Sequence, residues 1–482
     1  MTSFKLVLLW TDTLLFVLVG VTIAGALYAR QREHLRAPWR AVRRRPLGMA
    51  ALVVLAGYVA VGLLDSIHFR LPLPKTDNAA AMDRLDYSTE VVSLLDMLVR
   101  PLKERVEKTY SAPFATHLYA KETVERPDGT ETRGFPRLRY GGAHLADPMA
   151  DRGADIAATA RLGSIQGLLV WVLMIVLLVT WQARRHNLAW GELLRRVVLG
   201  RLDTPWREIL ATLGVLLLCG FVVGNLAAKY HVLGTDKVGP DVLYLSLKSI
   251  RTGIVIGTLT TLIMLPFAIM LGIMAGYFRG WADDVIQYLY TTLSSIPAVL
   301  LIAAAILTLQ AHMAVHPEVF DTAALRADAR LLFLCAILGV TSWTSLCRLL
   351  RGETLKLRET EFIQAAKAYG AGASTIILRH LLPNVMHIVL ITVVLDFSGL
   401  VLAEAVLSYV GVGVDPTTIS WGTMINSARL EMAREPMVWW SLFAAFTFMF
   451  ALVLAANLFS DVVRDAFDPR LKSAVEPPAI ES

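Results

Sequence analysis

Long apolar runs separated by arginine-rich segments dominate the hydrophobic pattern of this chain. A helix needs about 20 consecutive apolar residues to cross the hydrocarbon core of a bilayer, and nine runs reach or approach that length. They lie near residues 5–28, 48–64, 165–181, 208–228, 250–278, 285–309, 331–350, 385–411 and 437–459. The pattern predicts an all-α polytopic membrane protein with about nine transmembrane helices.

Three clusters of basic residues orient these spans. They follow the first, third and seventh runs and occupy residues 30–45, 184–207 and 348–379. Nine spans place all three clusters on one side, which the excess of Lys and Arg identifies as cytoplasmic. The N-terminus is then expected outside and the C-terminus inside. Cleavage of a signal peptide near Ala24-Gly25-Ala26 is disfavoured, because it would leave the first cluster outside the membrane.

Two long polar segments interrupt the membrane pattern. Residues 66–163 are too long for a simple loop and predict a small external α+β domain. Within it, residues 88–110 have helical apolar spacing that Pro101 should interrupt, and Pro127-Asp128-Gly129 predicts the turn of a β-hairpin. The other polar segment is the cytoplasmic loop at residues 351–384.

Composition supports a membrane protein and argues against several other classes. Hydrophobic residues make up 55% and charged residues 18%, with a mean hydropathy of +0.55, which soluble domains rarely approach. The net charge of +6 follows the membrane topology, so membrane lipid is the expected surrounding and nucleic acid is not an expected partner. The three cysteines form no CxxC pair and the ten histidines lack metal-ligand spacing, so no metal or cofactor is predicted.

A short helix–turn–helix is predicted in the cytoplasmic loop. Residues 359–369 are mostly strong helix formers, and Gly370 and Gly372 can end that helix. Ser374 suits the N-cap of a second helix, which Pro383 should limit. One face of the first helix carries small and aromatic residues: Phe362, Ala365, Ala366 and Tyr369. Such a face suits a partner that approaches closely, whereas the simpler alternative is an amphipathic loop lying on the membrane.

The loop resembles the EAA loop of type I ABC importer permeases, in the spacing of the dipeptide/oligopeptide/nickel permease family. The matching residues are Gln364-Ala365-Ala366, Gly370 and Leu382-Pro383. Gln364 stands where the family usually has Glu, and Glu361 or Glu359 could supply a charge nearby. Three further stretches resemble the second-permease (C-type) branch in the same order along the chain. These are residues 231–242, residues 404–422 (with Glu404, Leu407–Gly413 and Ser420–Gly422) and residues 464–470.

The resemblance covers residues 206–472 and implies a six-helix permease core there, with the coupling loop 351–384. The hydrophobic pattern divides the rest of the chain into two N-terminal spans (1–65), the external domain (66–163), a third span with a cytoplasmic linker (164–205) and a cytoplasmic tail (473–482).

The resemblance also implies partners in a bacterial inner membrane: a second permease forming a heterodimer, two ATP-binding subunits and a periplasmic solute-binding protein. The implied ATPase-coupling residues are Glu361, Phe362, Gln364, Ala365, Ala366, Tyr369, Gly370, Leu382 and Pro383. The sequence contains no GxxxxGK[ST] phosphate loop and no Ser-His-Asp or HExxH constellation. The chain is therefore predicted not to be an enzyme, and ATP hydrolysis is expected in the partner subunits.

Polar residues within the eighth span are candidates for a translocation path. Asp396 and Glu404 lie within about 80° of each other on a helix of 3.6 residues per turn, and Ser408 follows one turn later. A carboxylate at bilayer depth costs about 2.5–3.5 kcal/mol, so both should face the bundle interior. They would then line a path for a cationic or zwitterionic solute or, alternatively, make a structural contact between helices.

Glycines and prolines in the fifth and sixth spans predict packing features. The pairs Gly253/Gly257 and Gly272/Gly276 have the small-xxx-small spacing of close helix contacts. Pro266 and Pro297 should bend their helices.

Two alternatives to a peptide permease remain open at the level of sequence. One is a permease of the same fold for another solute, such as nickel, an opine or a sugar-peptide conjugate. The other is a membrane-anchored interaction or sensor protein whose external domain is the working part.

Overall fold

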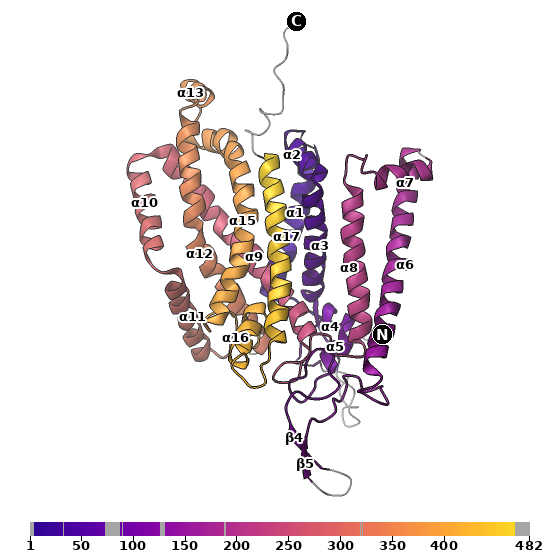
Figure 1. The fold of residues 1–482 in the computed structure, drawn as a ribbon. Coiled ribbons are helices and arrows are strands. Elements are labelled where there is room, and N and C mark those ends of the chain that lie inside the picture. Colours follow the sequence, from indigo (N-terminus) through magenta and orange to yellow (C-terminus); the bar gives the residue numbers. More distant parts are fainter. Residues whose placement is uncertain are drawn as a thin grey trace, which may run out of the picture. The chain divides into compact units, whose positions relative to one another are not determined.

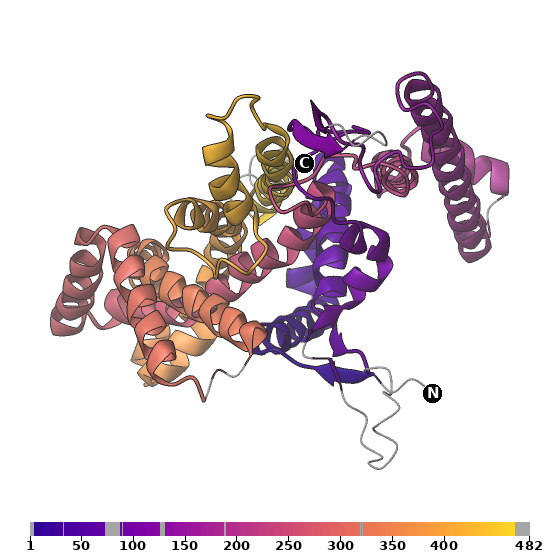
Figure 2. The ribbon, with the colours of Figure 1, turned by 90° about the horizontal axis from the view of Figure 1, so that it is seen from below.

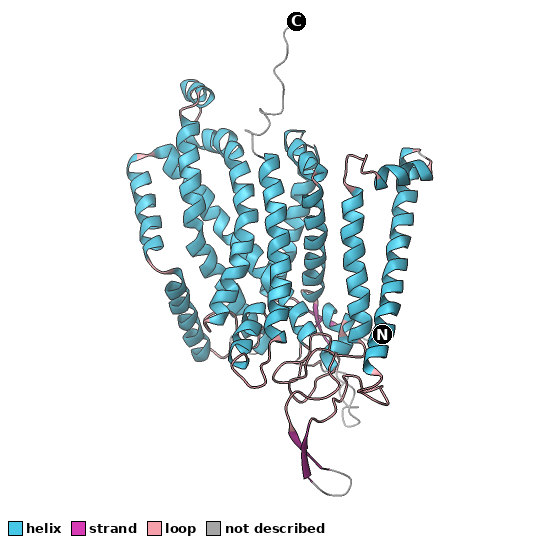
Figure 3. Cartoon of the chain, viewed as in Figure 1, coloured by secondary structure: helices cyan, strands magenta, loops and turns pink. Residues whose placement is uncertain are grey.

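The computed structural model describes residues 4–31, 33–72, 87–88, 90–125, 131–187, 189–318, 320 and 322–467. Helices account for most of this chain, and the strands belong to one three-stranded and one two-stranded sheet (Figure 3). The predicted fold class, a helical membrane protein that also contains small β-sheets, is confirmed, and the side of the membrane on which residues 66–163 lie stays a prediction. The described residues fall into two compact units. The first lies within Met1–Val7, Ala41–Thr252 and Ile419–Ala455. The second lies within Leu8–Arg40, Gly253–Thr418 and Ala456–Ser482.

The first unit holds the described part of residues 66–163, for which we keep the name external domain from its predicted location, and the helices that flank it. Its helices are α3 (Pro46–Asp65), α4 (Leu94–Leu98), α5 (Arg100–Glu104), α6 (Arg152–His186), α7 (Trp190–Val198), α8 (Trp206–Ala227) and α16 (Trp421–Glu431). Its strands are β1 (Lys5–Val7), β2 (His68–Arg70), β3 (Val92–Ser93), β4 (Glu122–Glu125) and β5 (Glu131–Gly134). The antiparallel order β1-β2-β3 joins the beginning of the chain to both ends of the segment that follows α3.

The external domain is less helical than predicted. Residues 90–110 contain strand β3 and two five-residue helices, and the break between the helices at Val99 confirms the interruption predicted near Pro101. Ser93 begins α4 with a capping box to Asp96, and Pro101 occupies the first turn of α5, where its missing N–H is tolerated. The predicted β-hairpin is confirmed by the antiparallel pairing of β4 with β5. Its predicted turn, Pro127-Asp128-Gly129, lies outside the described residues.

Helices α6 and α8 lie side by side as an antiparallel pair (Figure 1 and Figure 2). Close contact is possible because Gly163 and Gly167 of α6 face the α8 backbone, where a Cβ would stand 2.8–3.0 Å from its atoms. The Trp171 indole N–H donates to the Leu210 carbonyl at 2.7 Å across the same contact. The two helices therefore pack through the α8 backbone at the two glycines and through the side chain of Trp171.

The second unit contains most of the remaining helices. They are α1 (Trp10–Gln31), α10 (Gly280–Ser295), α11 (Ala298–Val315), α12 (Ala323–Arg358), α13 (Glu361–Ala368), α14 (Ala373–Thr375), the π-helical turn η2 (Ile376–Leu381) and α15 (Leu382–Tyr409). Three helices contribute residues to both units: α2 (Glu33–Arg44), α9 (Val242–Phe278) and α17 (Trp440–Phe467).

Eight of the described helices are long and apolar enough to cross a membrane, against about nine predicted. The predicted sixth span, residues 285–309, is wrong as a single helix: α10 ends at Ser295 and α11 begins at Ala298. The break falls at Pro297, whose ring and missing N–H prevent a continuous helix. The predicted seventh span lies within α12, which is not among the eight.

The helices of the second unit pack through the predicted glycine seams. A Cβ on Gly257 would stand 2.6 Å from the Phe397 ring, and one on Gly272 would stand 2.8 Å from the Cys347 carbonyl of α12. Gly276 meets Thr354 one turn later in the same way. These small residues let α9 approach α12 and α15 closely. α9 also continues through Pro266 without ending.

The first helix is fastened to α12 by a residue far along the chain. The Asp328 carboxylate accepts hydrogen bonds from the backbone N–H groups of Trp10, at 2.8 Å, and Thr11, at 3.4 Å. It also accepts the Thr11 hydroxyl. A carboxylate at this end satisfies N–H groups that have no partner inside the helix and complements the helix dipole.

Candidate functional site

The loop at residues 351–384 contains a short helix that is joined tightly to α12. Glu359 and Thr360 separate α12 from α13, which runs from Glu361 to Ala368 and lies beyond the ends of α12 and α15 (Figure 1). Gly370 follows with φ of +80°, the left-handed conformation that ends a helix and that glycine adopts without strain. The predicted helix and its glycine terminator are confirmed.

One side of α13 is anchored and the other is open. Ile363 is completely buried and Ala366 packs against the core of the second unit. Phe362 is 45% exposed and Tyr369 is 92% exposed, and Glu361, Ala365 and Gly370 are also exposed. An exposure of 92% for an aromatic side chain marks a surface that lacks a packing partner within the described chain.

Gln364 makes a contact that a glutamate, the residue usual at this position in the EAA loop, could not make. Its side-chain N–H donates to the Arg358 carbonyl at 3.1 Å, at the C-terminal end of α12. A carboxylate has no proton to donate at neutral pH, so this bond requires the amide. Gln364 therefore ties α13 to the preceding helix and remains exposed beside the open face.

The second half of the loop differs from the prediction in two respects. The N-cap of α14 is Gly372, and Ser374 lies inside that helix. Pro383 does not interrupt the helix, because η2 passes directly into α15. Pro383 stands in the first turn of α15, where its missing N–H is tolerated. The preceding turn, η2, has π-helical hydrogen bonds and not the usual α-helical ones. Leu382 beside it is partly buried and Pro383 itself is exposed.

Several contacts of the loop were missed at the level of sequence. Glu359 forms an ion pair with Arg279 at 2.8 Å, and the Arg358 guanidinium donates to the Tyr277 carbonyl at 2.7 Å. The Lys367 ammonium stands 5.3 Å from the centre of the Tyr277 ring. The partners are about 80–90 residues apart in sequence, so no local motif could have indicated them.

The intramembrane candidates separate into two places on α15. The Ser408 hydroxyl donates to the Glu404 carboxylate at 2.7 Å, and both side chains are buried. Asp396 lies two turns earlier and is partly exposed. Glu404 and Ser408 are thus brought together one turn apart, while Asp396 is not part of their contact.

A buried ionic cluster joins the external domain to the segment before α9. His231 lies 2.7 Å from Asp241 through Nδ1 and 3.4 Å from Glu107 through Nε2, and all three side chains are at most 3% exposed. The Glu107 carboxylate also accepts three backbone N–H groups, from residues 139–141. We call Glu107, His231 and Asp241 the external clasp.

Two members of the external clasp, His231 at its centre and Glu107 at one end, have pKa shifts in opposite directions. Burial opposes protonation of His231, but hydrogen bonds and charges from Asp241 and Glu107 outweigh it and raise the His231 pKa to about 9. Burial alone would raise the pKa of Glu107, but His231 and the backbone N–H groups lower it to about 2. His231 and Glu107 are therefore both charged at neutral pH.

Backbone contacts extend the external clasp over the whole segment 229–242. Thr235 donates its N–H to the Ser111 carbonyl at 3.1 Å, and Glu107 donates its N–H to Gly239 at 3.0 Å. A Cβ on Gly239 would stand only 1.7 Å from the Glu107 carbonyl oxygen. The Trp440 indole N–H also donates to the Thr235 carbonyl at 2.9 Å. The external domain therefore holds this segment by many separate bonds.

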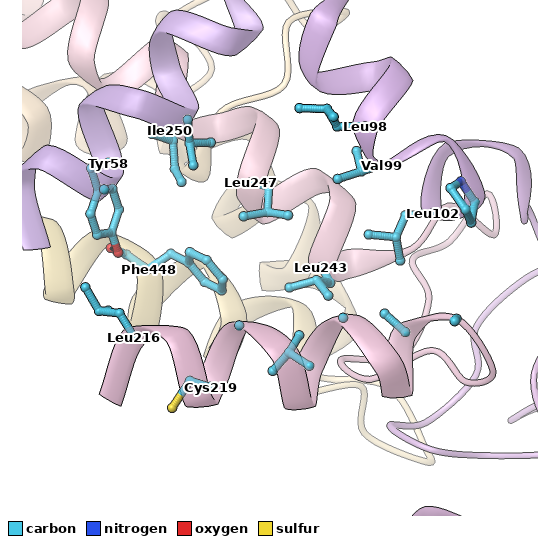
Figure 4. A pocket seen from close by; sticks show the side chains of 18 of the residues that line it. Tyr58, Leu98, Val99, Leu102, Leu216, Cys219, Leu243, Leu247, Ile250 and Phe448 are labelled. Atoms are coloured by element: carbon cyan, nitrogen blue, oxygen red, sulfur yellow. The ribbon is translucent and has the colours of Figure 1, made fainter. Parts of the chain in front are cut away.

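An apolar groove of about 610 Å³ lies among α3, α5, α8 and α9 in the first unit (Figure 4). Side chains such as Leu216, Leu243 and Leu247 line it, together with Cys219. The Tyr58 hydroxyl at its wall already donates to the Phe448 carbonyl at 2.8 Å. The lining offers mostly hydrocarbon contact, so the groove does not suit a polar solute.

The apolar helices and the exposed helix–Gly–helix loop beyond them define a polytopic transport permease. The sequence profile of the binding-protein-dependent transport system inner membrane component matches residues 268–473. The oligopeptide transport system permease protein OppC of Mycobacterium tuberculosis (strain ATCC 25618 / H37Rv) is 33% identical over 243 residues, which cover 50% of this chain and 77% of that protein. The chain belongs to this family, the inner-membrane permeases of ABC importers.

Other relatives have the same extent. The glutathione transport system permease protein GsiD of Pectobacterium atrosepticum is 32% identical over 243 residues, covering 50% of this chain and 74% of that protein. A putative peptide permease protein of Brucella suis biovar 1 is 31% identical over 242 residues, covering 50% and 73%. The relatives are transport permeases, and the chain is a multi-pass inner-membrane protein of the same kind. The family as a whole works with ATPase and binding-protein partners.

Proposed function

We propose that this chain forms half of the translocation pathway of an importer for peptides or a related small solute. A second permease subunit supplies the other half as a heterodimer. The names of the relatives support this substrate class, since they include oligopeptide, glutathione and peptide permeases. Asp396, Glu404 and Ser408 are the candidates for polar contacts along the path. Because Ser408 already bonds Glu404, Asp396 is the better placed of the two carboxylates to meet a solute.

We further propose that two separate ATP-binding subunits act on the complex and that one docks on α13. The observation that carries this proposal is the open face of α13, with Tyr369 92% exposed beside the completely buried Ile363. A rigidly anchored helix with an exposed aromatic side chain suits the transmission of force from a soluble partner. Glu361, Phe362, Gln364, Ala365, Ala366, Gly370, Leu382 and Pro383 complete the coupling element.

The membrane orientation belongs to the same proposal. The arginine clusters put the coupling loop and the C-terminus in the cytoplasm and the N-terminus outside, with α12 counted as a ninth crossing. At 36 residues α12 is about 54 Å long, enough to span a bilayer. Residues 66–163 then face the periplasm, where a solute-binding protein delivers its cargo to the permease core of residues 206–472.

A charge on the open face of α13 should weaken ATPase binding. Tyr369→Arg is expected to lower the affinity of the ATPase subunit at least about tenfold, because an apolar anchor is lost and a charge is desolvated. The tagged chain is purified from host membranes at a series of dilutions of constant salt concentration. The measurement is the amount of ATPase subunit that remains bound to the chain at each dilution, which gives the relative affinity. Tyr369→Phe, which keeps the ring, is the matched control and should bind as the wild type does.

Failure of the tagged wild-type chain to recover any ATPase subunit would contradict the proposal. A biological function of the chain that survives Tyr369→Arg, without any measurable uptake, but is lost on deletion of residues 66–163 would favour the membrane-anchored sensor instead.

A further inference from the structure

The corner between α9 and α10 has an unusual backbone. Arg279 has φ of +57° and ψ of −170°, a conformation found almost only at glycine. Gly280 follows with φ of +58°. A residue with a Cβ keeps such a conformation only when its surroundings hold it there. Arg279 is therefore a place where the fold constrains the chain for a reason beyond local preference.

The side chain of Arg279 reaches the base of α13. Its guanidinium pairs with Glu359 at 2.8 Å, and Glu359 lies between α12 and α13. Arg358 binds the Tyr277 carbonyl, and Lys367 of α13 covers the Tyr277 ring. We call Tyr277, Arg279, Arg358, Glu359 and Lys367 the corner clamp.

Charge makes Glu359 the central member of the corner clamp. The clamp brings three cations, Arg279, Arg358 and Lys367, to one carboxylate. Consistently, burial and then the charge of Arg358 lower the pKa of Lys367, while Glu359 acts in the opposite direction. Loss of the Glu359 charge would leave the cations to repel one another and push α13 away from the corner.

The corner is also rigidly joined to the membrane helices. Arg351 of α12 binds Asp283 of α10 through two nitrogens, at 2.6 and 2.7 Å. Gly276 of α9 packs against Thr354 of α12 with no room for a side chain. A push on residues 277–279 is therefore delivered directly into α9 and α10.

We propose that the α9–α10 corner is a second input point for the movement of α13, and that Glu359 is the positioning residue that connects them. α13 is joined covalently only to α12 and, through α14 and η2, to α15. The corner clamp adds a non-covalent route into α9 and α10. This inference rests on the proposed docking of an ATPase on α13.

The test measures whether α13 and α10 move as one body. Spin labels are placed at Ala368→Cys on α13 and Tyr288→Cys on α10, both exposed, in a chain with Cys219→Ser. The other cysteines, Cys335 and Cys347, are completely buried. The complete transporter is purified through a tag on this chain and reconstituted in liposomes. Label distances are recorded without nucleotide and with MgATP and vanadate.

A narrow distance distribution that MgATP and vanadate leave unchanged is expected with the intact clamp. Glu359→Arg should broaden it and make it nucleotide-dependent, and should lower MgATP hydrolysis at least about fivefold. The double variant Arg279→Glu/Glu359→Arg restores the ion pair and should restore both readouts. Arg279→Gly keeps the corner conformation and removes only the ion pair with Glu359, so it should broaden the distance distribution less than Glu359→Arg, which also reverses a charge among the cations.

Glu353→Arg is the matched control. Glu353 pairs with Lys356 on the same helix, at 3.1 Å, and lies outside the clamp. Its replacement should change neither readout. If Glu359→Arg and the milder Glu359→Gln both keep the narrow distribution and wild-type hydrolysis, the inference is wrong while the proposed function stands. If the wild-type complex holds no ATPase subunit and MgATP changes nothing in any variant, both fail.

Discussion

Replacement of Glu107 by alanine is expected to destabilise the external domain by about 3–5 kcal/mol. The change removes one carboxylate of a buried ionic cluster and leaves the His231 Nε2–H group without its acceptor, while Nδ1 keeps its contact with Asp241. It also removes the acceptor of three backbone N–H groups from residues 139–141. Because this domain is held to the segment 229–242 by the same cluster, both should open together. The measurement is the urea concentration at which a protease cleaves half of the domain in the detergent-purified protein, which we call the urea midpoint.

Glu104→Ala is the matched control for this expectation. Glu104 pairs with Arg100 at 2.6 Å, but their side chains are 59% and 72% exposed. Exposed pairs contribute little, so this change should shift the stability by no more than about 0.5 kcal/mol. Equal midpoints for Glu107→Ala and Glu104→Ala would show that the external clasp does not hold the domain.

The stability of the external domain should also depend on pH, with a sign set by the two shifted groups. The pKa of His231 is raised to about 9 from an ordinary value of 6.5, so its contribution is complete below 6.5 and lost as the pH rises through 9. The pKa of Glu107 is lowered to about 2 from 4.5, so its contribution is complete above 4.5 and lost as the pH falls toward 2.

The domain should therefore be most stable between about pH 4.5 and 6.5 and weaken from there to pH 9. The urea midpoint at pH 5.5 and at pH 9.5 measures the difference. His231→Gln should remove most of the alkaline change. A midpoint that falls equally in wild type and His231→Gln would assign the effect to other groups.

The second large effect is expected at the end of the coupling helix. Gly370→Pro should lower uptake of a radiolabelled tripeptide at least about tenfold without reducing the amount of chain in the membrane. Gly370 has φ of +80°, whereas proline is fixed near −65°. Proline would also remove the N–H that bonds the Lys367 carbonyl at 2.9 Å. The Tyr369 tip would then leave its position, while the spans stay folded.

Gly370→Ala separates strain from loss of the hydrogen bond. An alanine Cβ would meet nothing within 4 Å, so only the left-handed backbone opposes it, at about 1–2 kcal/mol. Uptake should fall only partly. Wild-type uptake by Gly370→Pro would exclude a coupling role for this helix end, and loss of the protein from the membrane would make its effect a folding defect.

Local pattern predicted the features that depend on neighbouring residues. The apolar runs indicated most of the spans, and the helix formers before Gly370 indicated α13 and its end. Gly257, Gly272 and Gly276 were recognised as contact positions because their spacing follows one helix face.

Features that depend on distant residues could not be predicted. Glu107 and His231 are 124 residues apart, and Arg279 and Glu359 are 80 apart, so only the fold brings them together. Pro297 was recognised as a bend, but whether a proline bends or ends a helix depends on what surrounds it. Pro101 indicated the break between α4 and α5, which falls at Val99, but hydrophobic spacing did not reveal that α4 begins only at the Ser93 cap.

The contact between Asp328 and the beginning of α1 has a consequence for synthesis. The two partners are separated by 317–318 residues, and a ribosome adds about 5–20 residues per second. The first helix therefore waits roughly 15–60 s for the carboxylate that receives its N–H groups. During that interval the N–H groups of Trp10 and Thr11 must donate to water, lipid headgroups or the insertion machinery. Docking of α1 onto α12 is thus a late event in synthesis of the protein.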